Sequence, residues 1–259
     1  MRLLTVPRPA GASGGAATAP APAAGPVYPP PAWAAGATGR GVRVAVVDSG
    51  WDRSRPDPRV LPGAAFARED TAGDDHDRIG HGTGVAFQLL ALAPECRVLP
   101  ARVFGGTLET SPRALVAAID WAVRQGAQVV NLSLGTERED AVRPLYAACE
   151  RARRAGVIVV AAGGNFGETC YPAVLDPVIG VRMGDTGAPF HYRYHPDDAL
   201  EVEAWGVRVP VPGVGGRMEI ATGTSIAAPA VSGIVALLLE RHPGAGVDDV
   251  RALLARHAR

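Results

Sequence analysis

The chain has 259 residues, of which 47% are hydrophobic and only 5% are aromatic, so it is long enough to bury one substantial core. It carries 26 basic and 26 acidic residues, and without a net charge it has no field that would gather nucleic acid or an anionic membrane. No apolar run approaches the roughly 20 residues that a membrane span needs. We therefore expect neither a nucleic-acid partner nor a membrane partner.

The cysteines and the N-terminal sequence indicate the cellular compartment in which the protein is expected to work. Cys96, Cys149 and Cys170 are odd in number and follow no metal-ligand or CxxC spacing, which favours reduced thiols. Proline and glycine interrupt the N-terminal sequence "MRLLTVPRPAGASGG" before any apolar signal region forms. Both observations predict a cytoplasmic protein.

Residues 1–31 are dominated by Ala, Pro and Gly, as in "GASGGAATAPAPAAGPVYPPP". Such a composition buries too little apolar surface to offset the entropy lost on ordering. We predict a disordered or extended arm over residues 1–31 and a folded domain over residues 32–259.

Strand-like and helix-like segments alternate through the folded domain. The pattern predicts strands over 42–48, 96–104, 127–135 and 157–165, and helices over 82–93, 112–126, 140–156, 222–240 and 246–259. The helix at 112 has Ser111 as its N-cap, Pro112 at its first position and Gly126 as its stop. Residues 176–219 predict short strands and loops, with a surface loop or hairpin around His191 and His195.

The predicted strands are apolar on both faces, and helices separate them. This order indicates a single α/β domain with a mostly parallel sheet that helices cover on both sides. In such sheets, functional sites gather at the C-terminal ends of the strands.

Four polar residues fall at this edge of the predicted sheet. Asp48 and Asn165 end two strands, while His81 and Ser225 begin two helices. Each residue alone is typical of a turn or a helix cap. Together they match what a serine nucleophile requires: an imidazole base, a carboxylate that orients it, and hydrogen-bond donors for the oxyanion. The helix that begins at Ser225 would add backbone N–H groups and its positive dipole end.

The segments "VAVVDSG", "GHGT", "NLSLG", "AAGGN" and "GTSIAAP" resemble the sequence blocks of the subtilases, the subtilisin-like serine proteases, in that family's order. The resemblance runs from about Trp33 to the helix after Ser225. It implies that Asp48 orients His81, that His81 is the general base and acid, that Ser225 is the nucleophile, and that Asn165 helps to bind the oxyanion.

The resemblance also implies that a peptide substrate binds as an added strand between two backbone edges. One edge would be residues 133–135, and the other would lie around Gly105, Gly106 and Thr107. Cys170 would lie near the floor of the specificity pocket and Phe166 near its rim, so we expect a neutral, apolar substrate residue before the scissile bond. The alternative for Cys170 is a small buried hydrophobe. The expected pocket walls are Ser133, Leu134, Gly135, Ala162, Gly163 and Gly164.

The sequence departs from the family in two internal segments. The block that usually reads HGTHVAG is "HGTGVAF" here, so Gly84 and Phe87 predict altered packing of that helix. The insertion that carries a calcium loop in many subtilases is missing, so we expect no cofactor and no metal. The cluster Asp74, Asp75, His76 and Asp77 is interpreted as a solvated acidic loop; the alternatives are a metal site and a preference for basic substrate residues next to the cut.

The third departure precedes the domain. The roughly 40 residues before the first strand are too few to fold as the propeptide of secreted subtilases, and they are similar to the short leader of intracellular subtilisins. One hypothesis is that "RLLTVPRP" lies in or near the active site and inhibits it; the alternative is a tail without a role.

These expectations lead to a cytoplasmic serine endopeptidase. A catalytically weak peptide-binding module is the main alternative, because Phe87 or the arm could spoil the site. An esterase or acyltransferase with the same triad is a third reading, which the substrate-binding edges disfavour.

Overall fold

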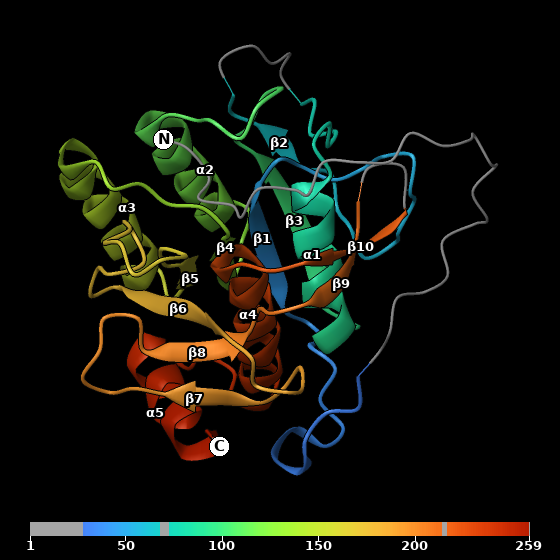
Figure 1. Ribbon diagram of the computed structural model, residues 1–259, viewed down its shortest axis with the longest axis vertical. Coiled ribbons are helices and arrows are strands. Elements are labelled where there is room, and N and C mark those ends of the chain that lie inside the picture. The colour runs from blue at the N-terminus through green and yellow to red at the C-terminus, as the bar shows by residue number, and fades with distance from the viewer. Residues whose placement is uncertain (1–27, 68–72, 214–216, 259) are drawn as a thin grey trace.

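The computed structural model describes residues 28–67, 73–213 and 217–258 (Figure 1). Most of the predicted arm, residues 1–27, lies outside the described residues. Its last part does not: the Tyr28 N–H donates to the Ala91 carbonyl over 3.3 Å, and the Tyr28 ring meets Trp205 edge to face with centroids 5.9 Å apart. Tyr28 is thus already packed against the folded domain.

An eight-stranded sheet forms the centre of the molecule, in the order β2-β3-β1-β4-β5-β6-β8-β7. All neighbouring strands run parallel except β7 and β8, so the predicted α/β fold with a mostly parallel sheet is confirmed. The strands are β1 (Arg43–Asp48), β2 (Ala64–Ala65), β3 (Arg97–Arg102), β4 (Val129–Leu132), β5 (Ile158–Ala162), β6 (Val178–Gly184), β7 (Tyr192–Tyr194) and β8 (Val202–Trp205); β9 (Val209–Pro212) and β10 (Met218–Ala221) form a separate hairpin.

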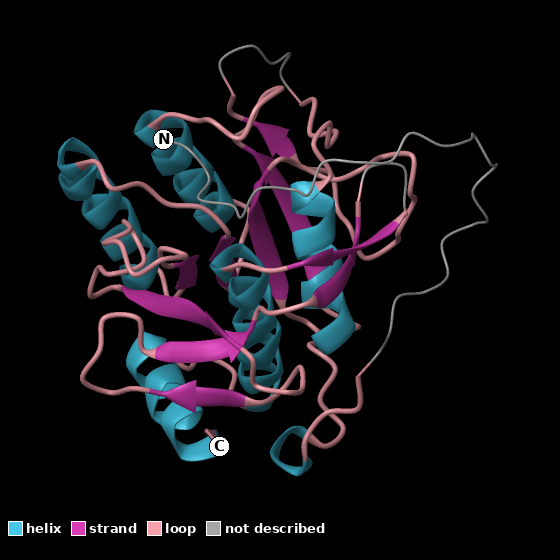
Figure 2. Cartoon of the chain, viewed as in Figure 1, coloured by secondary structure: helices cyan, strands magenta, loops and turns pink. Residues whose placement is uncertain are grey.

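Helices lie on both sides of this sheet (Figure 2). On one side α1 (His81–Leu92) and α4 (Thr224–Arg241) pack against the sheet, with α5 (Val247–His257) beside them. On the other side lie α2 (Pro112–Arg124) and α3 (Val142–Arg154). Two short 3₁₀ helices, η1 (Ala32–Ala34) and η2 (Glu139–Ala141), complete the described elements.

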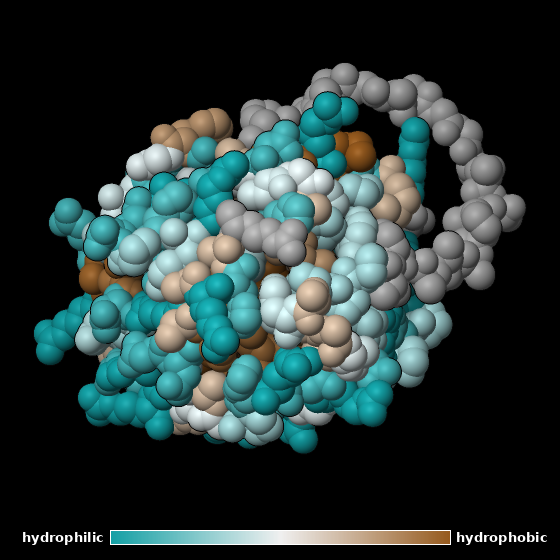
Figure 3. All heavy atoms as spheres, turned by 90° about the horizontal axis from the view of Figure 1, so that it is seen from below, coloured by the Kyte–Doolittle hydropathy of each residue, from teal (hydrophilic) through white to brown (hydrophobic). Residues whose placement is uncertain are grey.

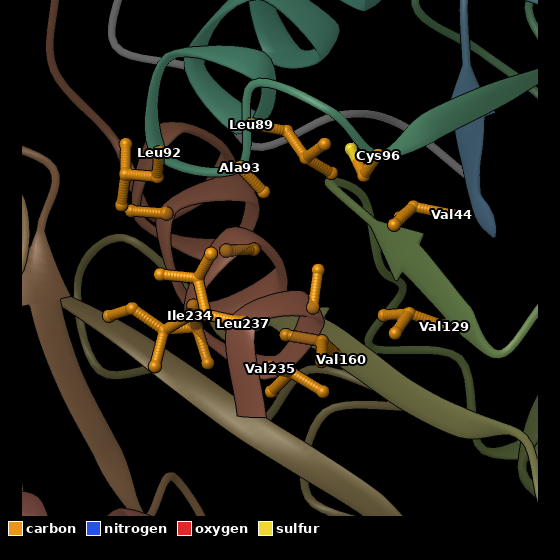
Figure 4. Packing of buried hydrophobic residues seen from close by; sticks show 14 of the residues in the cluster. Val44, Leu89, Leu92, Ala93, Cys96, Val129, Val160, Ile234, Val235 and Leu237 are labelled. Atoms are coloured by element: carbon orange, nitrogen blue, oxygen red, sulfur yellow. The ribbon is translucent and has the colours of Figure 1, made fainter. Parts of the chain in front are cut away.

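The core is divided by the sheet because successive side chains of each strand point to opposite faces. Val44 and Val46 of β1 pack toward α1 and α4, whereas Ala45 and Val47 pack toward α2 and α3. Figure 4 shows the first cluster, in which α1 and α4 contribute Leu89, Leu92, Ile234, Val235 and Leu237 and the strands contribute Val44, Val129 and Val160.

The central helix is α4, in which every residue from Thr224 to Leu239 is buried. It is apolar and long enough to meet the composition of a membrane span, but 89% of that window is buried inside the fold. Its apolar sequence is therefore explained by its place in the core. On the face shown in Figure 3, hydrophilic side chains prevail and apolar ones form small separate patches.

The segment predicted as a surface loop or hairpin is the β7–β8 hairpin, and it is more than a surface feature. It extends the sheet beyond β6, and the Tyr192 hydroxyl donates to the Leu254 carbonyl of α5 over 2.9 Å. Tyr192 is 1% exposed. The hairpin thus anchors the C-terminal helix to the sheet.

Candidate active site

Asp48, His81 and Ser225 meet at the C-terminal edge of the sheet. Asp48 is the last residue of β1, His81 the first of α1 and Ser225 the second of α4. His81 Nδ1 lies 2.8 Å from Asp48 Oδ1, and His81 Nε2 lies 3.2 Å from Ser225 Oγ. Three residues that are far apart in the chain thus form one continuous hydrogen-bonded row.

The carboxylate of Asp48 determines the protonation of the imidazole. Asp48 is fully buried, and its Oδ1 also accepts the Ser49 N–H over 2.7 Å. An ionised carboxylate only accepts hydrogen bonds, so Nδ1 of a neutral His81 carries the proton. The lone pair of Nε2 then faces the Ser225 hydroxyl, as a general base requires.

A buried carboxylate, Asp77, holds the helix end that carries His81. Its Oδ1 accepts the N–H groups of Ile79 (2.9 Å) and Gly80 (2.7 Å). Its Oδ2 accepts the N–H (2.9 Å) and the hydroxyl (2.6 Å) of Thr83. Because the first N–H groups of a helix have no partner within the helix, this capping fixes the start of α1 and with it His81.

The prediction that residues 74–77 form a solvated acidic loop is wrong for two of them. Asp75 is 5% exposed and Asp77 is 6% exposed. Asp75 pairs with Arg53 and accepts the Gly63 N–H over 2.7 Å. Both carboxylates face inward because the loop folds over them, and acidic residue type alone does not indicate this. The structure shows no group of three or more metal-ligating side chains within residues 28–67, 73–213 and 217–258.

A buried polar network supports the backbone at Ser225. Pro229 has no N–H, so it leaves the Ser225 carbonyl without its usual partner inside α4. The Ser133 hydroxyl donates to that carbonyl over 2.7 Å, and Asn131 donates to Ser133 Oγ over 2.9 Å. Ser232 completes the network by donating to Asn131 Oδ1 over 2.9 Å. The network joins β4 and the strand end after it to α4 at Ser225.

Asn165 lies beside Ser225 on the loop after β5. Its Oδ1 accepts the Thr224 N–H over 2.9 Å and the Thr224 hydroxyl over 3.1 Å. The carbonyl oxygen of the amide therefore binds Thr224. The N–H of Ser225 has no carbonyl partner within α4, because Ser225 is only the second residue of the helix.

A small pocket opens next to Ser225. Its volume is about 10 Å³, room for about one water molecule. Burial raises the pKa of the Cys170 thiol to about 12, so Cys170 is an inert apolar wall. The pocket is lined by Ser133, Leu134, Gly135, Ala162, Gly163, Cys170, Thr224 and Ser225.

The other predicted substrate-binding residues lie elsewhere. Gly164 does not line this pocket, and Phe166 projects into solvent with 78% of its surface exposed. Gly105 and Gly106 border a separate, wide cavity of about 700 Å³, together with Phe66 and Val103. The structure thus brings six of the ten predicted residues together next to Ser225.

Gly84 and Phe87 stand away from the reacting groups. A Cβ atom on Gly84 would lie 3.4 Å from the Pro212 carbonyl oxygen and 3.5 Å from Val211 Cβ, which are ordinary van der Waals distances, so Gly84 faces the β9–β10 hairpin with room for a methyl group. Phe87 is half-buried and lines neither cavity. The departure from the usual family block therefore accompanies a close helix–hairpin contact.

Comparison with known proteins places this geometry in a family. The model of the Subtilase family matches residues 39–259. The thermostable alkaline protease of Halalkalibacterium halodurans is 34% identical over 230 residues, which are 83% of this chain and 62% of that protein. Subtilisin DY of Bacillus licheniformis is 32% identical over 240 residues, which are 87% of this chain and 86% of that protein. The chain thus spans less than two thirds of the first of these relatives.

Comparison with solved structures leads to the same family. Fervidolysin from Fervidobacterium pennivorans, described as a keratinolytic enzyme related to subtilisin, superposes with a TM-score of 0.71 at 28% identity, over 86% of this chain and 40% of that one. A cold-adapted subtilisin-like serine proteinase superposes with a TM-score of 0.72 at 24% identity, over 85% of this chain and 83% of that one, and supports the fold. With the family match over residues 39–259, these similarities show that the chain belongs to the subtilase family, the subtilisin-like serine proteases.

Proposed function

We propose that this protein is a serine endopeptidase that hydrolyses peptide bonds through an acyl-enzyme on Ser225. The observation that carries the proposal is the row of two hydrogen bonds, 2.8 Å from Asp48 to His81 and 3.2 Å from His81 to Ser225. Family membership adds support, since the relatives named above are proteases.

In the first half of the reaction, His81 Nε2 takes the proton of the Ser225 hydroxyl as Oγ attacks the substrate carbonyl carbon. The oxyanion that forms accepts hydrogen bonds from the Asn165 side chain and the Ser225 backbone N–H. His81 then gives its proton to the leaving amine as the C–N bond breaks. Asp48 remains ionised and holds Nδ1–H throughout.

In the second half, a water molecule takes the place of the amine. His81 removes a proton from this water as it attacks the acyl carbon, and a second tetrahedral intermediate forms in the same oxyanion site. The bond to Ser225 Oγ breaks, Oγ regains its proton from His81, and the new carboxylic acid leaves.

The substrate is proposed to bind as an extended strand, with residues 133–135 as one edge and the stretch around Gly105 and Gly106 as the other. The small pocket beside Ser225 supports a neutral substrate residue no larger than about alanine before the scissile bond, because Cys170 fills its floor. The exposed Phe166 offers apolar surface to longer substrates.

Three further parts of the proposal concern the setting of the enzyme. We propose that it works in the cytoplasm, where its three buried, unpaired cysteines would stay reduced, and that it needs no metal. We also propose that the N-terminal segment "RLLTVPRP" lies in or near the active site of the resting enzyme and inhibits it. Deletion of residues 2–26, which spares the packed Tyr28, should then raise activity; unchanged activity would dispose of self-inhibition.

Labelling with a fluorophosphonate probe tests the nucleophile directly. Intact-mass analysis should show one adduct on the form without residues 2–26 and weaker labelling of the full chain, and Ser225→Ala should show none. An adduct only on the shortened form would support self-inhibition. If neither form is labelled although both are folded, the peptidase proposal fails and a peptide-binding module remains.

A further inference from the structure

The loop that carries Asn165 needs support from outside the sheet. Strand β5 ends at Ala162, and the Gly163 N–H still donates to the Val181 carbonyl of β6 over 2.8 Å, but residues 164–168 lie beyond the described strands. A hydrogen-bond donor lowers the barrier only when it is already aimed at the place where the negative charge develops. Something must therefore fix the backbone of Asn165.

Glu168 supplies that support. Its Oε1 accepts the Asn165 N–H over 3.1 Å, and its Oε2 accepts the Phe166 N–H over 2.8 Å. Hydrogen bonds from N–H groups to a carboxylate are stronger than those between neutral groups. The loop thus closes on its own acidic side chain, with both oxygens in use.

Two glycines make this closure possible. Gly167 has a φ of 88°, the left-handed conformation that turns the chain back at low cost. A Cβ atom on Gly164 would lie 2.5 Å from Glu168 Cδ, so only glycine leaves room for the carboxylate. The two glycines therefore allow Glu168 to bind the N–H groups of Asn165 and Phe166, an arrangement called the Glu168 clamp below.

The Glu168 clamp acts on a different part of Asn165 from the contact made by Thr224. Thr224 binds Oδ1 of the side chain, whereas Glu168 binds the backbone N–H. Thr224 also ties the loop to α4, because its single hydroxyl proton is shared between Asn165 Oδ1 and the Gly163 carbonyl oxygen, which lies 2.8 Å from the hydroxyl. The backbone N–H of Asn165 is thus held by Glu168, and its side-chain oxygen by Thr224.

We propose that Glu168 is a positioning residue for the oxyanion site: its carboxylate holds the loop so that the Asn165 side chain is aimed at the developing charge. This inference rests on the proposed peptidase function. It predicts that loss of the carboxylate lowers kcat and leaves KM nearly unchanged, because the aim of Asn165 matters in the transition state more than in substrate binding.

A double-mutant cycle tests the proposal. Steady-state hydrolysis of a peptide p-nitroanilide is measured for the parent, Asn165→Ala, Glu168→Ala and the double variant. Asn165→Ala should lower kcat by about 10²- to 10³-fold, and Glu168→Ala should lower it by about 10- to 100-fold. In the Asn165→Ala background, Glu168→Ala should change kcat by less than about 2-fold, since the two residues act as a unit.

Two further variants separate positioning from general stability. Glu168→Gln keeps one acceptor oxygen but replaces the other with an N–H₂ donor, so it should regain only part of kcat, while Glu139→Ala, an exposed site on η2, should behave as the parent. Equal losses from Glu168→Ala in both backgrounds, or no loss in either, would overturn the inference and leave the peptidase proposal intact. A folded parent without turnover would instead refute the proposed function itself.

Discussion

Cys170 should set the size of the substrate residue that precedes the scissile bond. A Cβ atom on Gly135 would lie only 2.1 Å from Cys170 Sγ, so the thiol rests directly against the opposite wall of the pocket. The space that remains is about 10 Å³. Alanine fits such a pocket with little rearrangement, but leucine does not.

Replacement of Cys170 by glycine removes two heavy atoms from the pocket floor. This makes room for about two more carbon atoms of the substrate, and burial of each contributes about 0.8 kcal/mol. The transition state for a leucine substrate should therefore gain about 1.6 kcal/mol relative to alanine. The ratio of kcat/KM for leucine over alanine should rise about 15-fold.

The assay compares two peptide p-nitroanilides that differ only in this residue, with enzyme concentrations normalised by fluorophosphonate titration. Cys149→Ala is the matched control, because Cys149 is also buried and unpaired but lies on α3, across the sheet from the pocket. The reasoning is refuted if the parent already prefers leucine or phenylalanine to alanine, or if Cys170→Gly leaves the ratio unchanged.

Four other predictions concern stability. Asp77→Ala should lower the free energy of unfolding by about 2–4 kcal/mol in urea denaturation, because it removes the cap of α1, and Asp77→Asn should lose less; equal losses would contradict the capping role. Gly84→Ala should raise the free energy of unfolding by about 0.5–1 kcal/mol through helix propensity, since its Cβ would make contacts of 3.4 Å or more with the β9–β10 hairpin; a loss would show that the hairpin cannot accept it. His257 stacks on Trp33 with ring centroids 4.8 Å apart, and burial lowers the pKa of this imidazole. The stabilising contribution of the neutral ring is therefore present above the unfolded pKa of about 6.5 and is lost as the pH falls through the folded pKa. Urea titrations should show that the free energy of unfolding of the parent falls relative to that of His257→Phe below pH 6.5. Parallel pH profiles of the two proteins would contradict this. Incubation with EDTA should change neither Tm nor kcat, and a fall in Tm would reveal a required metal.

The helices and strands that hold the triad could be predicted because their signals are local. Ser111 does cap α2, where its hydroxyl oxygen accepts the Ala114 N–H over 3.1 Å, and Gly126 ends the turn after it with a φ of 71°. The apolar strand that ends at Asp48 and the glycine-rich end of β5 can likewise be recognised from a local pattern of a few consecutive residues. A parallel sheet then brings these strand ends to one edge, whatever the details of packing.

The residues that hold the triad in place could not be predicted in the same way. Asp77 and Glu168 each bind backbone N–H groups of a turn that closes around them. In the sequence, each is one acidic residue in a polar loop. Whether its side chain points into the protein depends on the φ angles of nearby glycines and on how the rest of the loop packs over it. The local pattern of residues 176–219 does not specify their arrangement for a related reason: β6 pairs with β8, so the place of β8 in the sheet is decided by a pairing across about 20 residues.

Pro229 shows how a broken local rule can indicate a functional site. A proline in the sixth position of a helix lowers helix propensity and removes one backbone hydrogen bond. Here the released carbonyl is that of Ser225, and it is bound by Ser133, which follows β4 and lines the pocket beside Ser225. The proline therefore exchanges a bond within α4 for one that ties Ser225 to the pocket wall. Such an exchange holds Ser225 in place relative to the pocket at the expense of a hydrogen bond in the helix, which is the pattern expected where local preference yields to function.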